Sequence, residues 1–167
     1  RALPIDLRFD SPDGGLIVVA DYGHGLFDED GARNIALRKT RGYLAITVQS
    51  NSANWGFNLL TKWPRADYVV VDRNELNLAC ANRSTSVEAQ ANFLSYAMEA
   101  RYFTVTLGHE GCVVGRGDDF VGLGALSDKV VDRMGAGDAF LAATAPLAWA
   151  GAPPEIIALV GNVAGAI

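Results

Sequence analysis

Four consecutive residues near the C-terminal end of the sequence, Gly135, Ala136, Gly137 and Asp138, have the types and order that suit a phosphate-binding turn. They separate an apolar run, "KVV", from an alanine-rich stretch, "DAFLAATAPLA". If the run is a strand and the stretch a helix, the small residues form the helix N-terminus. Backbone N–H groups there lack intrahelical partners, and the helix dipole attracts negative charge.

Asp138 would lie beside an anion bound at that turn. Its carboxylate could accept the proton of an attacking hydroxyl, as the base does in phosphoryl transfer. A plain strand-to-helix connection with a favourable acidic residue explains the same four residues equally well. The sequence contains no P-loop and no Rossmann glycine motif, and neither of its two histidines, His24 and His109, lies near a G-x-S-x-G elbow.

Four short apolar runs indicate the strands that would position this turn. They are "GLIVVADYGHG", "YLAITVQ", "ADYVVVDRNE" and "YFTVTLG", in residues 15–25, 43–49, 66–75 and 102–108. Continuous apolar runs of this length are typical of strands buried on both faces of a parallel sheet. Ligands of such sheets bind beyond the carboxyl ends of the strands, which points to residues 21–25, 49–54, 72–77 and 108–111.

Helical patterns lie between and after these runs. In residues 85–100, Thr85 and Glu88 have the spacing of a capping box, and one helical face is apolar: Val87, Ala91, Leu94 and Met98. Residues 112–124 and 129–132 predict an antiparallel meander at one edge, and residues 135–151 and 153–167 predict two final helices. The sequence therefore predicts a single α/β domain with a mostly parallel sheet.

Composition excludes several classes of function. The chain has 167 residues, 50% of them hydrophobic, and a net charge of −5 without a basic cluster, so we expect a globular domain that does not bind nucleic acid. Its longest apolar stretch is shorter than a membrane span, and no signal peptide is apparent. Cys80 and Cys112 lack metal-ligand spacing. We expect a cytoplasmic protein without membrane contact.

The segment "VVDRMGAGDAF" resembles the C-terminal signature of the ribokinase-like (PfkB-type) carbohydrate kinases, Asp-Thr-x-Gly-Ala-Gly-Asp-x-Phe, with Arg133 in place of Thr. Three further segments are similar to family motifs and follow the family order. "VDRNELNLA" resembles the Asn-x-x-Glu segment through Asn74, with Asn77 where Glu is expected. "TLGHEG" resembles a Thr-x-Gly-x-x-Gly turn, and "GNVAGAI" resembles an Asn-Ala-Ala-Ala-Ala stretch.

The resemblance implies a three-layer α/β/α fold and ATP-dependent phosphorylation of a hydroxyl on a sugar or sugar phosphate, with Mg²⁺ bridging the phosphates. It implies that Asp138 is the catalytic base, that Gly135, Ala136 and Gly137 form the anion hole, and that Asp132 helps to bind a monovalent cation such as K⁺. Nucleotide-binding positions are implied for Asn74, Thr106, Gly108, Gly111 and Asn162. Asn74 could instead cap a helix, and the Thr and Gly residues could simply shape a turn.

A narrower resemblance concerns "VVADYGHGLF". It is similar to the "SDYGKG" strand end of the heptose-phosphate kinases and of related sugar kinases fused to nucleotidyltransferases, with His24 in place of Lys. The Asp-Pro-Lys that follows the next strand in the heptose enzymes is replaced here by "TVQSNSANWGFN". This resemblance leaves open a fused nucleotidyltransferase domain and a homodimer.

Members of this family normally run to about twice this length, and neither their glycine-rich sugar-binding segment nor their β-sheet lid is recognisable here. We therefore interpret residues 1–167 as the central and C-terminal portion of a kinase domain whose N-terminal part and lid are missing. The alternative is a non-catalytic regulatory domain that binds a nucleotide or sugar and retains the kinase fold. Arg133 and Asn77 favour that alternative.

Overall fold

The computed structural model describes residues 14–38, 42–50, 54–126 and 135–166, and in them six strands form one mixed sheet. The first four strands pair in parallel, and the fifth strand pairs antiparallel with both the fourth and the sixth, so the predicted parallel runs and the antiparallel edge at 112–124 are confirmed. Residues 129–132 lie outside the described residues. The strands lie side by side in chain order: β1 (Gly15–Asp21), β2 (Gly42–Val48), β3 (Tyr68–Asp72), β4 (Tyr102–Thr106), β5 (Cys112–Arg116) and β6 (Asp119–Leu123).

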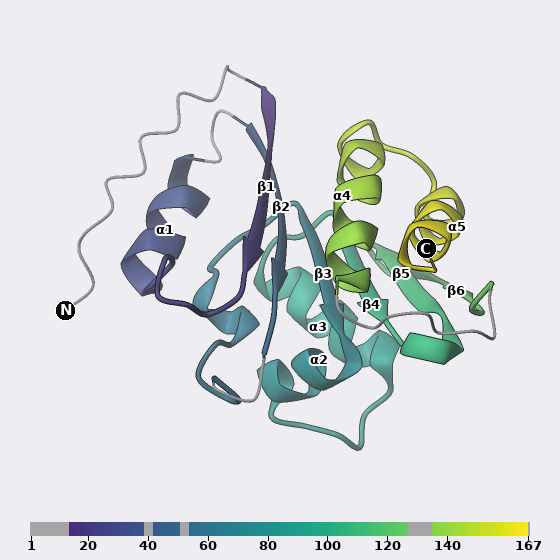
Figure 1. Ribbon diagram of the computed structural model, residues 1–167, viewed down its shortest axis with the longest axis horizontal. Helices are drawn as coiled ribbons and strands as arrows, with labels where there is room; N and C mark the ends of the chain where they lie inside the picture. The colour runs from purple at the N-terminus through teal and green to yellow at the C-terminus, as the bar shows by residue number, and fades with distance from the viewer. Residues whose placement is uncertain (1–13, 39–41, 51–53, 127–134, 167) are drawn as a thin grey trace.

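Helices cover both faces of this sheet, which confirms the α/β/α architecture (Figure 1). One face carries α1 (Glu29–Arg38), α2 (Arg73–Cys80) and α3 (Val87–Ala97), and the opposite face carries α4 (Ala136–Trp149) and α5 (Pro154–Gly165). Two short 3₁₀ helices, η2 (Leu60–Lys62) and η3 (Gly108–Glu110), lie in the connections. No helix in the described ranges is long and apolar enough to cross a membrane.

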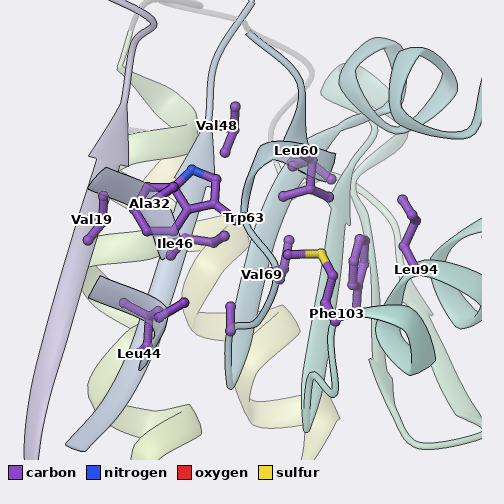
Figure 2. Packing of buried hydrophobic residues seen from close by; sticks show 14 of the residues in the cluster. Val19, Ala32, Leu44, Ile46, Val48, Leu60, Trp63, Val69, Leu94 and Phe103 are labelled. Carbon is purple, nitrogen blue, oxygen red and sulfur yellow. The ribbon is translucent and has the colours of Figure 1, made fainter. Parts of the chain in front are cut away.

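Alternate residues of the central strands pack into two separate cores. In β3, Val69 and Val71 face the core beneath α1, α2 and α3, whereas Tyr68 and Val70 face the core beneath α4 and α5. Figure 2 shows the first of these cores, with Trp63 lying against the sheet. Burial on both faces explains why these strands are continuous apolar runs rather than alternating ones.

The start of α3 differs from the predicted capping box. Its N-cap is Ser86, whose side chain accepts a hydrogen bond from the backbone N–H of Ala89 at 3.2 Å. The Thr85 hydroxyl instead accepts a hydrogen bond from the amide of Asn82 at 2.9 Å, so the prediction for Thr85 and Glu88 was wrong. The predicted apolar face is confirmed: Ala91, Leu94 and Met98 are buried, and Val87 packs against them partly buried.

A capping box does begin α2. The Asp72 carboxylate accepts from the backbone N–H of Glu75 at 2.7 Å, and the Glu75 carboxylate accepts from the backbone N–H of Asp72 at 2.8 Å. The second oxygen of Glu75 accepts from the backbone N–H of Ser50, just beyond β2, at 3.0 Å. Burial, together with the negative charge of Asp72, outweighs these hydrogen bonds and raises the pKa of Glu75 to about 7.

A buried ion pair closes the carboxyl end of β1. Asp21 is only 2% exposed, and its carboxylate lies 2.6 Å from the ammonium of Lys62 and accepts from the indole N–H of Trp63 at 2.9 Å. Lys62 also donates to the carbonyl oxygen of Phe27 at 2.8 Å and to the side-chain oxygen of Asn58 at 2.6 Å. Both charges are therefore surrounded by hydrogen-bonding partners, which is the condition for burying them.

We expect Lys62→Met to lower the free energy of unfolding by about 3 to 5 kcal/mol, because it leaves the Asp21 carboxylate buried without its cation. Urea denaturation measures this loss. The matched control is Arg65→Met, which breaks an ion pair with Glu99 that is exposed on both sides and should cost less than about 1 kcal/mol. Adding Asp21→Asn to Lys62→Met should recover part of the loss, and equal costs for the Lys62 and Arg65 variants would contradict the assignment.

Glu75 should make stability depend on pH. Because its pKa is raised to about 7 in the folded protein, its stabilising contribution is fully present below its unfolded pKa and is lost as the pH rises through 7. The difference in unfolding free energy between the unsubstituted protein and Glu75→Gln should therefore fall by about 3 kcal/mol between about pH 4.5 and pH 8. Glu88→Gln, in the exposed first turn of α3, should retain the pH dependence of the unsubstituted protein, and a constant difference for Glu75→Gln would refute the shift.

Candidate functional site

A cavity of about 760 Å³ opens at the carboxyl ends of the parallel strands, where the sequence places its ligand site. The N-terminus of α4 forms one wall, and the ends of β1 to β4 and the first turn of α2 form others. Asp132 and Arg133 lie outside the described residues. The cavity lining includes every other site residue that the resemblance nominates: Asn74, Thr106, Gly108, Gly111, Gly135, Ala136, Gly137, Asp138 and Asn162.

The N-terminus of α4 presents free backbone donors to this cavity. Gly135 is the N-cap with φ +86°, a left-handed conformation that glycine adopts without strain, and no side chain caps the helix. The first intrahelical bond joins the N–H of Ala139 to the carbonyl of Gly135 at 2.8 Å. The N–H groups of Ala136, Gly137 and Asp138 therefore precede the helical hydrogen-bond ladder. A Cβ added at Gly137 would meet no atom within 4 Å, so the space beside it is open.

Two side chains hold the Asp138 carboxylate. The Tyr22 hydroxyl donates to Oδ2 at 2.7 Å, and the Gln49 amide donates to Oδ1 at 2.8 Å. Donation to Asp138 raises the pKa of Tyr22, so the phenol remains a donor. The sequence placed both residues within strand-end segments but did not nominate either one. The available signal was position, because Tyr22 directly follows β1 and Gln49 directly follows β2.

A second layer of hydrogen bonds fixes the backbone of these two residues. The Gln49 N–H donates to the Asp21 carbonyl at 2.9 Å, and the Asn58 amide bridges the carbonyls of Asp21 and Gln49 at 3.0 and 3.1 Å. The Asn54 amide donates to the Tyr22 carbonyl at 2.8 Å. Gly23 lies so close to Asn54 and Asn58 that a Cβ would overlap both side chains. These hydrogen bonds hold the carboxyl ends of β1 and β2 in a fixed position relative to each other.

The other end of the cavity is formed by a glycine turn and α5. Gly108 and Gly111 have φ of +63° and +98°, and a Cβ at Gly111 would overlap the carbonyl oxygen of Leu123. Thr106 ends β4 with its hydroxyl 3.5 Å from the Val71 carbonyl. The Asn162 amide donates to the carbonyls of Leu123 and Gly124 at 3.3 and 3.1 Å, which fastens α5 to the segment after β6.

The polar side chains of α2 are divided between the cavity and the contact with α3. Asn74 lines the cavity and does not cap α2, since the N-cap is Asp72. Glu75 also lines the cavity, and the negative charge of Asp138 contributes to raising its pKa. Asn77 instead accepts a hydrogen bond from the Gln90 amide at 3.2 Å, on the side of α2 that meets α3. No carboxylate therefore occupies the position at which the resemblance places Glu.

Comparison with known proteins agrees with this arrangement. The chain has the fold of phosphofructokinase-2 from Escherichia coli in complex with potassium, with a TM-score of 0.77 at 16% identity over 93% of this chain and 50% of that one. It is also similar to ribokinase from Thermotoga maritima (TM-score 0.69, 19% identity, 92% and 49% covered) and to adenosine kinase from Sinorhizobium meliloti (0.69, 24%, 90% and 47%). The chain thus spans about half the length of these structures.

A comparison with curated protein sequences finds no match. The family described as pfkB family carbohydrate kinase matches residues 31–167, which is most of the chain and includes α4 with its N-terminal turn. On that match, the chain belongs to the pfkB family of carbohydrate kinases.

Proposed function

We propose that the protein containing this chain transfers the γ-phosphoryl group of ATP to a hydroxyl of a sugar or sugar phosphate. The observation that carries the proposal is the placement of a carboxylate directly beside an uncapped helix N-terminus inside one cavity. The carboxylate of Asp138 can accept a proton, and the N–H groups of Ala136 and Gly137 can bind an anion. In phosphoryl transfer to an alcohol, such a carboxylate contacts the attacking hydroxyl while such donors contact the oxygens of the transferred phosphoryl group, so the two must lie side by side.

In this reaction the acceptor hydroxyl donates its hydrogen bond to Asp138 and loses its proton to that carboxylate as its oxygen bonds to the γ-phosphorus. The bond between the γ-phosphorus and the bridging oxygen breaks, and ADP leaves with the electron pair. The N–H groups at the start of α4 stabilise the charge on the transferred group. Each well-placed donor of this kind is worth about 3 to 4 kcal/mol in the transition state.

The nucleotide would lie between the start of α4 and the glycine turn after β4. The cavity is continuous from Asp138 to Thr106, Gly108 and Gly111, and reaches Asn162 on α5. Glycine at 108 and 111 leaves only backbone at those two positions of the wall. These features support the nucleotide-binding roles that the resemblance implies for the turn.

Metal ions enter the proposal through the nucleotide. The described residues include no cluster of three or more His, Cys, Asp or Glu side chains that could hold a metal. In the proposed reaction Mg²⁺ would be carried mainly by the nucleotide phosphates and water. Such an ion neutralises phosphate charge during transfer. A K⁺ site at Asp132 stays a prediction, supported by the similarity to a phosphofructokinase-2 structure in complex with potassium.

We propose that the protein is related to the heptose-phosphate kinases, and the residues at the carboxyl end of β1 support this. The Asp-Tyr-Gly segment that resembles those enzymes supplies the buried Asp21 and the Tyr22 that contacts the base. We propose that the chain is the central and C-terminal part of a longer kinase domain, because it spans about half of its structural neighbours. A homodimer, a fused nucleotidyltransferase domain and a cytoplasmic location stay predictions.

The test is phosphoryl transfer from ATP by the full-length gene product, measured as ADP release with a panel of sugars and sugar phosphates. We expect turnover with at least one acceptor, and we expect Asp138→Asn to lower kcat by about a hundredfold to ten-thousandfold because it removes the base. The matched control is Asp118→Asn. Asp118 also accepts a hydrogen bond from a tyrosine hydroxyl, that of Tyr96 at 2.8 Å, but it does not line the cavity.

Nucleotide binding without turnover for any acceptor would refute the kinase proposal and support the regulatory domain instead. The position of Asn77 favours that second candidate, because its side chain faces Gln90 and places no carboxylate in the cavity. Turnover that survives Asp138→Asn would refute the role of Asp138 alone.

A further inference from the structure

The Asp138 carboxylate is held by two donors that neither the resemblance nor the sequence motifs assign to the site. Tyr22 and Gln49 each donate to a different oxygen of the carboxylate, at 2.7 and 2.8 Å. They come from the ends of two neighbouring strands, 116 and 89 residues away in sequence. Such an arrangement fixes the position of the carboxylate and the plane in which it lies.

A first-turn carboxylate has a competing arrangement close at hand. At the third position of a helix, an acidic side chain can reach back to the backbone N–H of the N-cap residue, as Glu75 does in α2. Asp138 occupies that third position in α4, yet its two oxygens accept from Tyr22 and Gln49. The N-cap itself is Gly135, which has no side chain, so within the described part of the chain the first N–H groups of α4 have no side-chain cap and stay available to an anion.

The two donors are themselves firmly placed. The backbone of Gln49 is hydrogen-bonded to Asp21 and Asn58, and the Tyr22 carbonyl is hydrogen-bonded to Asn54. Asp21 is fixed in turn by its buried ion pair. The orientation of the base therefore depends on a connected set of contacts that begins in the core and ends at the cavity.

We infer that Gln49 and Tyr22 are positioning residues that turn the Asp138 carboxylate away from its own helix and toward the acceptor hydroxyl. This inference rests on the proposed function for its catalytic meaning, although the placement of the carboxylate can be tested without turnover. In the Tyr22 contact, a phenolic O–H donates to Oδ2 of Asp138. The alcohol O–H of a sugar would donate the same kind of hydrogen bond to this carboxylate.

Several titratable groups of the described residues line the cavity together with Asp138: Tyr22, Asp72, Arg73, Glu75 and His109. Tyr22 is the one of these that a printed hydrogen bond joins to Asp138, and His24 lies beside the Tyr22 ring with the ring centroids 6.2 Å apart. Gln49, from the end of β2, is an uncharged donor to the same carboxylate.

The test is the NMR chemical shift of the Asp138 carboxyl carbon in the full-length gene product labelled with ¹³C-aspartate, with the signal assigned by its loss in Asp138→Asn. Tyr22→Phe and Gln49→Leu should each change this chemical shift, because each removes the donor to one oxygen of the carboxylate. Gln49→Glu retains the size of the side chain but replaces the amide donor by a like charge, so it should change the chemical shift as well. Repeating the measurements in Glu75→Gln separates the contribution of Glu75.

The matched control is Tyr96→Phe, which removes the same kind of hydrogen bond from Asp118 on the opposite side of the sheet from α4. It should leave the Asp138 chemical shift unchanged. Where turnover is present, kcat should fall about tenfold for Tyr22→Phe and for Gln49→Leu, while the KM for ATP stays the same.

The two proposals fail in different ways. If the Asp138 chemical shift is the same in the unsubstituted protein, Tyr22→Phe, Gln49→Leu and Gln49→Glu, the positioning role is wrong, whatever the turnover. If the chemical shift changes as expected but the unsubstituted protein phosphorylates no acceptor, the placement of the carboxylate stands and the kinase proposal is wrong. A changed chemical shift together with a lower kcat in the same variants supports both.

Discussion

The candidate site depends on one buried ion pair between Asp21 and Lys62. A carboxylate at 2% exposure would be costly without a cation, so the chain must bring Lys62 and the residues around it to the end of β1. Asn58, which accepts a hydrogen bond from Lys62, uses its own amide to join the carbonyls of Asp21 and Gln49. The ends of two parallel strands are thereby fixed relative to each other.

Groups of opposite charge lie close together in the cavity. The uncapped start of α4 provides the positive end of a helix dipole, whereas Asp138 and the capping residue Glu75 supply carboxylates beside it. Burial and neighbouring charge raise the pKa of Glu75 to about 7, so part of the negative charge is lost near neutral pH. An anion at α4 therefore meets less repulsion than two ionised carboxylates would produce.

Local sequence patterns predicted the strands correctly but were less accurate for the residues that cap the helices. The apolar runs predicted the four parallel strands because strands buried on both faces cannot alternate with polar residues. The start of α3 was mispredicted because the Asn82 amide engages Thr85 and leaves the capping to Ser86. Asn74 likewise looked able to cap a helix, but Asp72 and Glu75 satisfy the donors at the start of α2.

The sequence alone determined the fold class, the parallel strands and the glycines that precede Asp138 at the start of its helix. Each of these is indicated by a short stretch of sequence: an apolar run, a pair of helix-start glycines or a motif in family order. Only the tertiary structure decided which groups hold that carboxylate. Tyr22 and Gln49 lie 116 and 89 residues from Asp138 in the chain, and no local pattern joins either residue to it. They meet Asp138 because parallel strands end at one edge of a sheet and a buried ion pair fixes where those ends lie.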